Sequence, residues 1–428
     1  MRQTNLIIPI LFLSAVGFSL ADSALAQRQL DPRAIITIPV TLNPRDSFSL
    51  PMPLAGLNAT DYDPVFIPRH ETLKNRGRGV IYFRDIWEYE FSFVGGLRQA
   101  VLEVPDLDSQ TTRRQNVWYI IYRIRDRGNT LTYEKVKQNP EFEHLLEQMN
   151  RDRPVAPEKK IFLPRFFLEG SVMGNPDDGY QHVRYPDITS PMILRQIQRL
   201  HDPGLTLLDP LQMSQAEIPL AATDADGGVW GAAVFTNVDP RIDYVSLFVE
   251  GLTNAFRITG EPGESNLRKT LQLNFWRPGG IIAEDKDRIT YGIPLVDNPQ
   301  QQVLIAQRYN LPGPLIRVYQ RRPDAGERRV LIAEVDAQVD LNTFESPLLP
   351  VLDGGTLPAV VADALVNAGH DVDNAQLSVA IEGKRWLLTN GDEEYIVAWE
   401  PQFWEPVTVR NKKQIRFIKA LDNLWIYR

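Results

Sequence analysis

The sequence predicts a mainly β protein: an immunoglobulin-like antiparallel β-sandwich with short helical insertions, plus a smaller C-terminal α+β unit. Two observations lead to this class. Apolar and polar residues alternate with period two in short runs that are rich in β-branched and aromatic side chains. Long connections and few helical patterns separate these runs, which favours an antiparallel sandwich over a parallel sheet with crossover helices.

The run at residues 87–94 shows the alternation most clearly. Trp87, Tyr89, Phe91 and Phe93 fall on one face, opposite Glu88, Glu90 and Ser92. This is the pattern of a strand with one buried face. Residues 117–125 are apolar on both faces before alternation resumes, which indicates a central strand. The other candidate strands are residues 99–104, 160–168, 215–220, 228–236, 244–258 and 269–276.

Two short helices are predicted as insertions. Residues 140–149 and 191–200 carry apolar side chains at helical spacing, and the second has Ser190 as its cap and Pro191 in its first turn. We expect both helices to cover a sheet edge or an open end of the sandwich, where they would block unwanted strand pairing.

After residue 295 the pattern changes to hairpins around one helix. Thr356 caps this helix and Gly369 ends it. Asn390-Gly391 predicts a type I′ turn in the second hairpin. The expected strands are residues 315–320, 329–335, 385–389, 395–399, 407–410 and 414–418. The predicted division of the chain is a signal peptide at 1–26, an N-terminal extended segment at 27–77, the β-sandwich at 78–295, a hairpin and linker at 296–355 and the α+β unit at 356–428.

The first 26 residues have the layout of a cleaved secretory signal. Arg2 precedes an apolar run from Leu6 to Leu20, and Ala24-Leu25-Ala26 forms a small-x-small exit before Gln27. The alternative is an uncleaved membrane anchor, but the run is short for a span of roughly 20 residues. We therefore expect a periplasmic or extracellular protein without a stable transmembrane anchor.

Charge and cysteine content exclude several classes of protein and site. The formal net charge is -8, which argues against nucleic acid as the main partner. The chain has no cysteine, which excludes a lipoprotein anchor, disulfides, thiolate metal sites and cysteine nucleophiles. Hydrophobic burial must therefore hold an exported fold together.

Six sequence blocks, at residues 87–93, 117–125, 229–243, 251–255, 268–279 and 424–428, occur in an order that resembles an uncharacterised family of secreted planctomycete proteins. The likeness covers roughly residues 80–295 and the last few residues. The resemblance implies export and a β-rich core. It implies no substrate or catalytic residue, because members of that family are hypothetical proteins without an assigned activity.

Asp224 and Asp226 are the candidate metal ligands. They precede Gly227 and Gly228, as at the start of a calcium loop. No further acid follows at the spacing of such a loop, and Asp-Gly beside a strand is also typical of a hairpin turn. The five histidines lack metal-binding spacing, and we expect them to be surface or capping residues. No catalytic residue and no cofactor is predicted.

Tryptophan is concentrated near the end of the chain. Trp386, Trp399 and Trp404 are the candidate binding residues, because exposed rings stack on sugars or fill a partner's pocket. The alternative is that these rings fill the core of a small domain. We expect Trp399 and Trp404, which flank Pro401, to be the exposed ones.

Taken together, these features favour an exported, non-catalytic protein of the cell envelope with a structural or protein-interaction role. Its expected partners are envelope proteins or polysaccharide. A carbohydrate-binding module, or a secreted hydrolase that acts on envelope polysaccharide, is the alternative.

Overall fold

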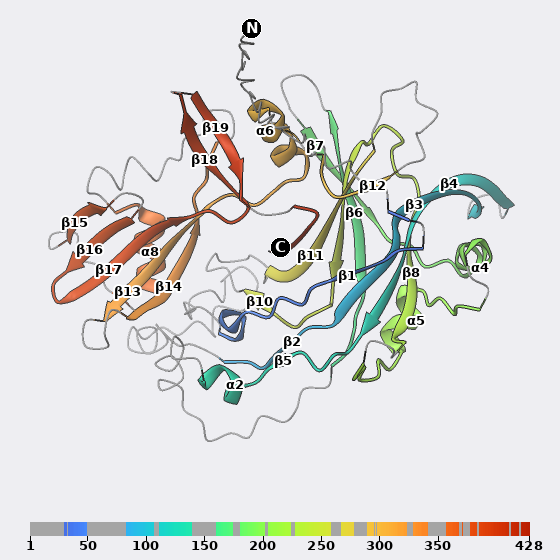
Figure 1. Ribbon diagram of the computed structural model, residues 1–428, viewed down its shortest axis with the longest axis horizontal. Helices are drawn as coiled ribbons and strands as arrows, with labels where there is room; N and C mark the ends of the chain where they lie inside the picture. Colours follow the sequence, from blue (N-terminus) through green and yellow to red (C-terminus); the bar gives the residue numbers. More distant parts are fainter. Residues whose placement is uncertain are drawn as a thin grey trace, which may run out of the picture.

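A computed structural model of the chain shows a large β-sandwich with a smaller sheet beside it (Figure 1). It describes residues 30–31, 33–48, 83–106, 111–138, 160–173, 180–201, 204–223, 227–257, 267–277, 289–294, 296, 298–322, 328–340, 357–367, 370, 377–382, 385–410, 412–418 and 421–428. The described chain is mainly β and its sheets are antiparallel, which confirms the predicted class. The immunoglobulin-like topology remains a prediction.

The sandwich has two layers. The first is a sheet in the order β1 (Ile35–Ile38), β3 (Glu90–Asp106), β4 (Thr111–Arg125) and β8 (Val229–Phe235). The second has the order β10 (Phe256–Arg257), β11 (Leu267–Trp276), β9 (Tyr244–Glu250), β6 (Arg165–Met173) and β7 (Tyr180–Pro186). Two further strands, β12 (Thr290–Tyr291) and β20 (Asn423–Tyr427), also pair with β11. Beside the layers lie η1 (Pro44–Ser47), β2 (Ile86–Trp87), β5 (Thr130–Leu131) and α2 (Tyr133–Lys137).

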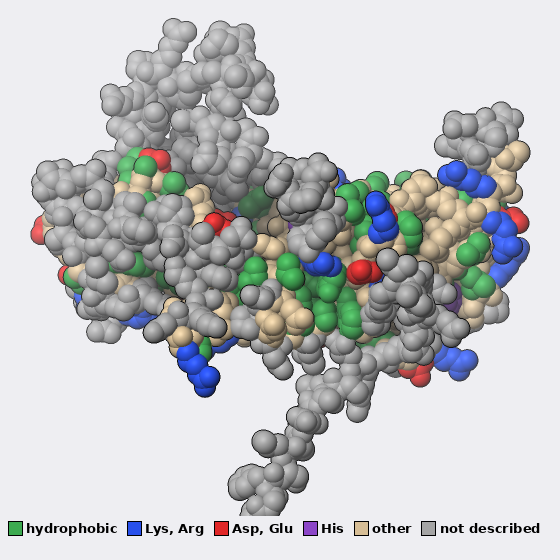
Figure 2. Space-filling model, turned by 90° about the horizontal axis from the view of Figure 1, so that it is seen from above, with side chains coloured by type: hydrophobic (Ala, Val, Ile, Leu, Met, Phe, Trp, Pro, Cys, Tyr) green, Lys and Arg blue, Asp and Glu red, His purple; other side chains and the backbone are tan. Residues whose placement is uncertain are grey.

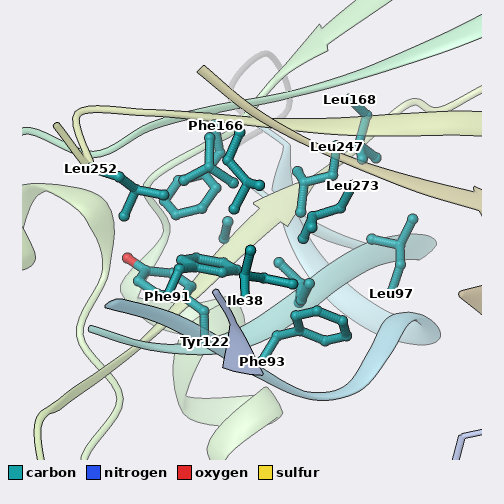
Figure 3. Close-up of a cluster of buried hydrophobic side chains, with 14 of the residues drawn as sticks. Ile38, Phe91, Phe93, Leu97, Tyr122, Phe166, Leu168, Leu247, Leu252 and Leu273 are labelled. Carbon is teal, nitrogen blue, oxygen red and sulfur yellow. The ribbon is translucent and has the colours of Figure 1, made fainter. Parts of the chain in front are cut away.

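The core lies where the two layers face each other (Figure 3). Phe91, Phe93 and Tyr122 of the first layer point toward Phe166 and Leu247 of the second, and all five are 1% exposed or less. The ring centroids of Phe91 and Tyr122 lie 5.8 Å apart, and those of Tyr122 and Phe166 lie 4.7 Å apart. Burying a side chain of this size contributes roughly 1.5–3 kcal/mol, so the alternation along β3 supplies much of the stabilisation of the sandwich.

β3 is one long strand where the sequence predicts two, at residues 87–94 and 99–104. Gly95 and Gly96 have φ values of 64° and 85°, and the register with β4 shifts between Val94 and Arg98. Glycine adopts positive φ without steric cost, so these residues form a bulge and the strand continues beyond it.

Lys and Arg side chains gather at the end of the molecule where the β3–β4 ribbon lies (Figures 1 and 2).

One predicted helix covers the outer face of the first layer. α4 (Pro191–Leu200) begins after Ser190, whose hydroxyl accepts a hydrogen bond from the backbone N–H of Ile193 at 3.5 Å. Ile193 and Ile197 are buried against apolar side chains of β3, β4 and β8. The helix is confirmed, but it covers a sheet face and not the expected edge or open end, because β4 is apolar on both faces. The predicted helix at residues 140–149 lies outside the described residues.

The strand predicted at residues 215–220 is wrong. The short helix α5 (Pro210–Gln215) ends where this strand was expected to begin, and the start of the helix is fixed by a reciprocal cap. The Asp209 carboxylate accepts from the Gln212 backbone N–H at 2.8 Å, and the Gln212 side chain accepts from the Asp209 N–H at 3.1 Å. Such a cap satisfies two helix-terminal donors. Further along, Leu220 makes a single bridge to Asp126.

The smaller sheet has the order β14 (Arg328–Asp336), β13 (Leu315–Arg322), β17 (Glu393–Glu400), β16 (Arg385–Asn390) and β15 (Leu377–Glu382), and α8 (Ala359–Asn367) packs against it. Both predicted hairpins are confirmed. Asn390 pairs with Glu393, so the loop residues of the second hairpin are Gly391 and Asp392. Of these two, Gly391 alone has positive φ, at 62°. This is the pattern of a type II′ turn and not of the predicted type I′ turn.

The sheets divide the chain differently from the predicted boundaries at 296–355 and 356–428. β13 lies in the same sheet as β15 to β17 and pairs with β17 along seven residues, from Leu315 to Arg321. β20 returns to the sandwich and pairs with β11. α6 (Pro299–Arg308) and the hairpin of β18 (Trp404–Val409) and β19 (Lys412–Phe417) share a hydrophobic cluster with the outer face of the second layer. Among the described residues the longest helices, α4 and α6, have 10 residues each, which is too short to span a bilayer.

Candidate functional site

The three tryptophans proposed as binding residues are buried. Trp386 on β16 is 2% exposed, Trp399 on β17 is 7% and Trp404 on β18 is 2%. Trp386 and Trp399 pack in the cluster that includes α8, and Trp404 packs in the cluster that includes α6. The expected exposure of Trp399 and Trp404 is therefore wrong. A small sheet covered by one helix needs large rings to fill its core, because each ring buries a large apolar area.

The two candidate metal ligands, Asp224 and Asp226, lie outside the described residues. Of the two glycines that follow them, Gly228 directly precedes β8. Gly228 has φ 73°, and a Cβ atom there would lie 2.6 Å from the carbonyl oxygen of Ile124. Over the residues that the structure describes, no group of three or more His, Cys, Asp or Glu side chains is placed to hold a metal ion.

His201 has the capping role that the sequence predicts for histidine. It ends α4, with Nδ1 2.9 Å from a guanidinium nitrogen of Arg98 and Nε2 2.8 Å from the hydroxyl oxygen of Tyr119. Burial, followed by the nearby charge of Arg98, lowers the pKa of His201 to about 4. The ring is therefore neutral at pH 7 and accepts from Arg98, so its basic nitrogen is already engaged.

A buried set of ionisable groups lies where η1, β11 and β20 meet, and we call it the Lys269 cluster. It consists of Asp46, Glu88, Lys269 and Tyr427. The Lys269 Nζ atom lies 3.0 Å from Asp46 Oδ2 and 3.3 Å from Glu88 Oε2, and the side chains of these three residues are 4% exposed or less. The ammonium group also donates to the carbonyl oxygen of Thr41 at 2.6 Å. All three ammonium donors therefore have an acceptor.

Each member of the Lys269 cluster comes from a different segment. Asp46 sits in the 3₁₀ turn η1, Glu88 follows β2, Lys269 lies near the start of β11, and Tyr427 ends β20. The Tyr427 hydroxyl donates to Asp46 Oδ1. Burial raises the pKa of Glu88, and the charge of Lys269 opposes that shift. Two buried acids thus share one cation, and Glu88 takes up a proton more readily than an ordinary glutamate does.

A second buried carboxylate, Glu169 on β6, is engaged by arginine. Arg428 donates to both of its oxygens, and the Arg428 guanidinium lies 4.3 Å from the ring centroid of Phe248. A nitrogen of Arg184 is 3.7 Å from Glu169. This arrangement ties the last residue of the chain to the second layer of the sandwich.

Asp187, a half-buried acid between β7 and α4, has a pKa that is shifted toward neutral. Burial raises the pKa of Asp187 to about 6. Its Oδ1 accepts from the backbone N–H of Phe166 at 3.4 Å. Asp187 also interacts electrostatically with Tyr122, which is 0% exposed and whose hydroxyl has no hydrogen-bond partner in the described structure.

None of these buried groups could be assigned from the sequence. The members of the Lys269 cluster are scattered over almost the whole chain, and no local spacing rule connects them. Comparison with known proteins adds no assignment, because no family model, no curated protein and no solved structure matches the chain. The chemistry of the site therefore rests on its geometry.

Proposed function

We propose that this chain is an exported, non-catalytic protein of the cell envelope with a structural or protein-interaction role. One observation carries the proposal: Lys269 engages both Asp46 and Glu88, and Arg428 engages Glu169. Carboxylates that cleave a glycosidic bond have to face the bound sugar. These buried carboxylates instead hold distant segments of their own chain together.

Packing between the sandwich and the smaller sheet supports a rigid body. One buried cluster contains Phe248 of the second layer and Trp404 of β18, and Val339, which follows β14, packs against both this cluster and the core of the smaller sheet. The guanidinium of Arg257 on β10 also binds Glu334 on β14, at 2.8 Å. A continuous apolar contact reinforced by an ion pair limits relative movement of the two parts. A rigid frame of this kind suits a protein that presents surfaces to partners.

Export is supported by residues 1–26 and by the resemblance to secreted planctomycete proteins. N-terminal sequencing of the protein recovered from the envelope of source cells tests this part. We expect the mature chain to begin at Gln27. Recovery from the cytosol with Met1 retained would contradict export.

The non-catalytic role is tested by incubating the purified chain with cell-wall polysaccharides, followed by measurement of released reducing sugar and of co-sedimentation. We expect neither. Release of sugar would establish the hydrolase alternative, and co-sedimentation without release would establish the carbohydrate-binding alternative.

A partner protein is tested by chemical crosslinking in intact source cells. We expect the chain to crosslink to another envelope protein. The exposed Arg113 and Arg114 at the ribbon end provide a variant, Arg113→Glu with Arg114→Glu, that should weaken this crosslink. Arg385→Glu, on the exposed part of β16 in the smaller sheet, is the control. No crosslink in the wild type would contradict an interaction role.

A further inference from the structure

The Lys269 cluster brings together an amine, a carboxyl group and a second acid, out of contact with water. The Lys269 Nζ atom is in contact with Asp46 and Glu88, and the Asp46 and Glu88 side chains are 3% and 0% exposed. The indole of Trp425 lies over the amine, with its centroid 5.3 Å from Nζ. Formation of an amide from a lysine and an aspartate requires this set: a nucleophile, an electrophile, a proton-transfer group and the exclusion of water.

We propose that Lys269 and Asp46 are joined by an intramolecular isopeptide bond, and that Glu88 transfers the protons that this reaction moves. The bond would link η1 to β11 across 223 residues of sequence. This inference goes beyond the envelope role, and neither depends on the other.

The reaction begins with a proton shift from the Lys269 ammonium to the Asp46 carboxylate. This shift converts a buried ion pair into a neutral amine and a neutral acid, which a dry environment favours. The Nζ lone pair then attacks Cγ of Asp46, and a C–N bond forms. The developing oxyanion at Oδ1 already has a hydrogen-bond donor in the Tyr427 hydroxyl.

Glu88 completes the reaction. Its carboxylate takes a proton from the attacking nitrogen and gives a proton to the departing oxygen, so that the C–O bond breaks and water leaves. Glu88 is thereby regenerated as the carboxylate. The products are one amide and one water, and the reaction needs no oxidant or other co-reactant. The raised pKa of Glu88 makes its carboxylate a stronger base for the first of these transfers.

The isopeptide bond would supply the covalent crosslink that a disulfide provides in other exported proteins. Exported proteins commonly fix their segments with disulfides, but this chain has no cysteine. An amide between Lys269 and Asp46 would fix the N-terminal segment permanently to β11, the strand with which β20 pairs. A buried amide is also protected from hydrolysis, because water is excluded from the cluster.

The intact mass of the denatured protein tests the proposal. We expect the wild type to be about 18 Da lighter than its sequence, because one water is lost. Glu88→Gln and Lys269→Arg should each have the mass of their own sequence. Cyclisation of an N-terminal Gln27 would remove about 17 Da, but it would occur equally in all three proteins, so the difference between wild type and variant isolates the crosslink.

Tryptic digestion of the wild type should yield a peptide that joins Asp46 to Lys269, with cleavage after Lys269 blocked. A wild type of unreduced mass and without this peptide would overturn the proposal and leave an ordinary buried ion cluster. A peptide that joins Lys269 to Glu88 would also overturn it, because Glu88 would then be the acyl group. If a variant fails to fold, the mass and peptides of the wild type still decide.

Discussion

Asp187 gives this protein a pH dependence opposite to that of most folded carboxylates. Burial raises its pKa from 3.8 to about 6. At pH values well below 3.8 the side chain is protonated in both the folded and the unfolded chain, and its contribution to stability is fully present. Between about pH 4 and pH 6 the unfolded chain releases the proton first, so the free energy of unfolding falls as pH rises through this window.

Replacing Asp187 with asparagine removes this titration. The variant keeps a side-chain oxygen that can accept from the Phe166 backbone N–H. The pKa difference is about 2 units, which corresponds to at most about 3 kcal/mol above pH 6. Partial exposure of the side chain reduces this value. We therefore expect Asp187→Asn to be about 1–3 kcal/mol more stable than the wild type at pH 7.5, and this difference to shrink to about 0.5 kcal/mol or less at pH 4.

Urea unfolding, followed by tryptophan fluorescence at several pH values from 4 to 8, measures this difference. Asp239→Asn is the control, because hydrogen bonds from Arg241 lower the pKa of Asp239 and the sign of its effect is reversed. The reasoning is refuted if Asp187→Asn and the wild type differ by the same amount at every pH.

Three further predictions concern stability and use the same urea assay. Gly251→Ala should lower the free energy of unfolding by about 2–5 kcal/mol, because Gly251 has φ 92° and a Cβ atom there would lie 2.2 Å from a backbone oxygen. Gly227→Ala is the control and should change the stability little, because a Cβ atom at Gly227 would have no other atom within 4 Å. Equal effects of the two substitutions would contradict this geometry. Trp386→Ala should cost about 3–5 kcal/mol, and a neutral result would show that this ring is not in the core. Leu424→Ala should cost about 2–5 kcal/mol and Val101→Ala less than about 0.5 kcal/mol, because Leu424 is 3% exposed and Val101 is 58% exposed. Similar costs would show that Leu424 is not buried in the cluster on the outer face of the second layer.

The features that the sequence predicted correctly are those with local causes. Ser190 and Pro191 start α4 through contacts within one turn. The strand at residues 87–94 could be identified because its aromatic residues alternate toward one core. The hairpin at Gly391 was found from its turn residue, although the turn type was wrong, because the register of the flanking strands decides which residues form the loop.

The features that the sequence did not predict depend on distant contacts. Alternation in residues 424–427 does not reveal that β20 pairs with β11. A count of tryptophans does not tell whether the rings face water, and Trp399 and Trp404 instead fill two cores. The Lys269 cluster is the extreme case, since each of its members is unremarkable in its own segment and acquires a role only where four segments meet.

The central claim of this account is that the N-terminal segment and the last strand are fixed to β11 around the Lys269 cluster. Hydrogen–deuterium exchange of the native protein tests it most directly. We predict that the amides of β20 exchange as slowly as those of β11, with residues 44–48 also protected. Exchange of β20 within seconds, at the rate of a frayed chain end, would contradict the claim.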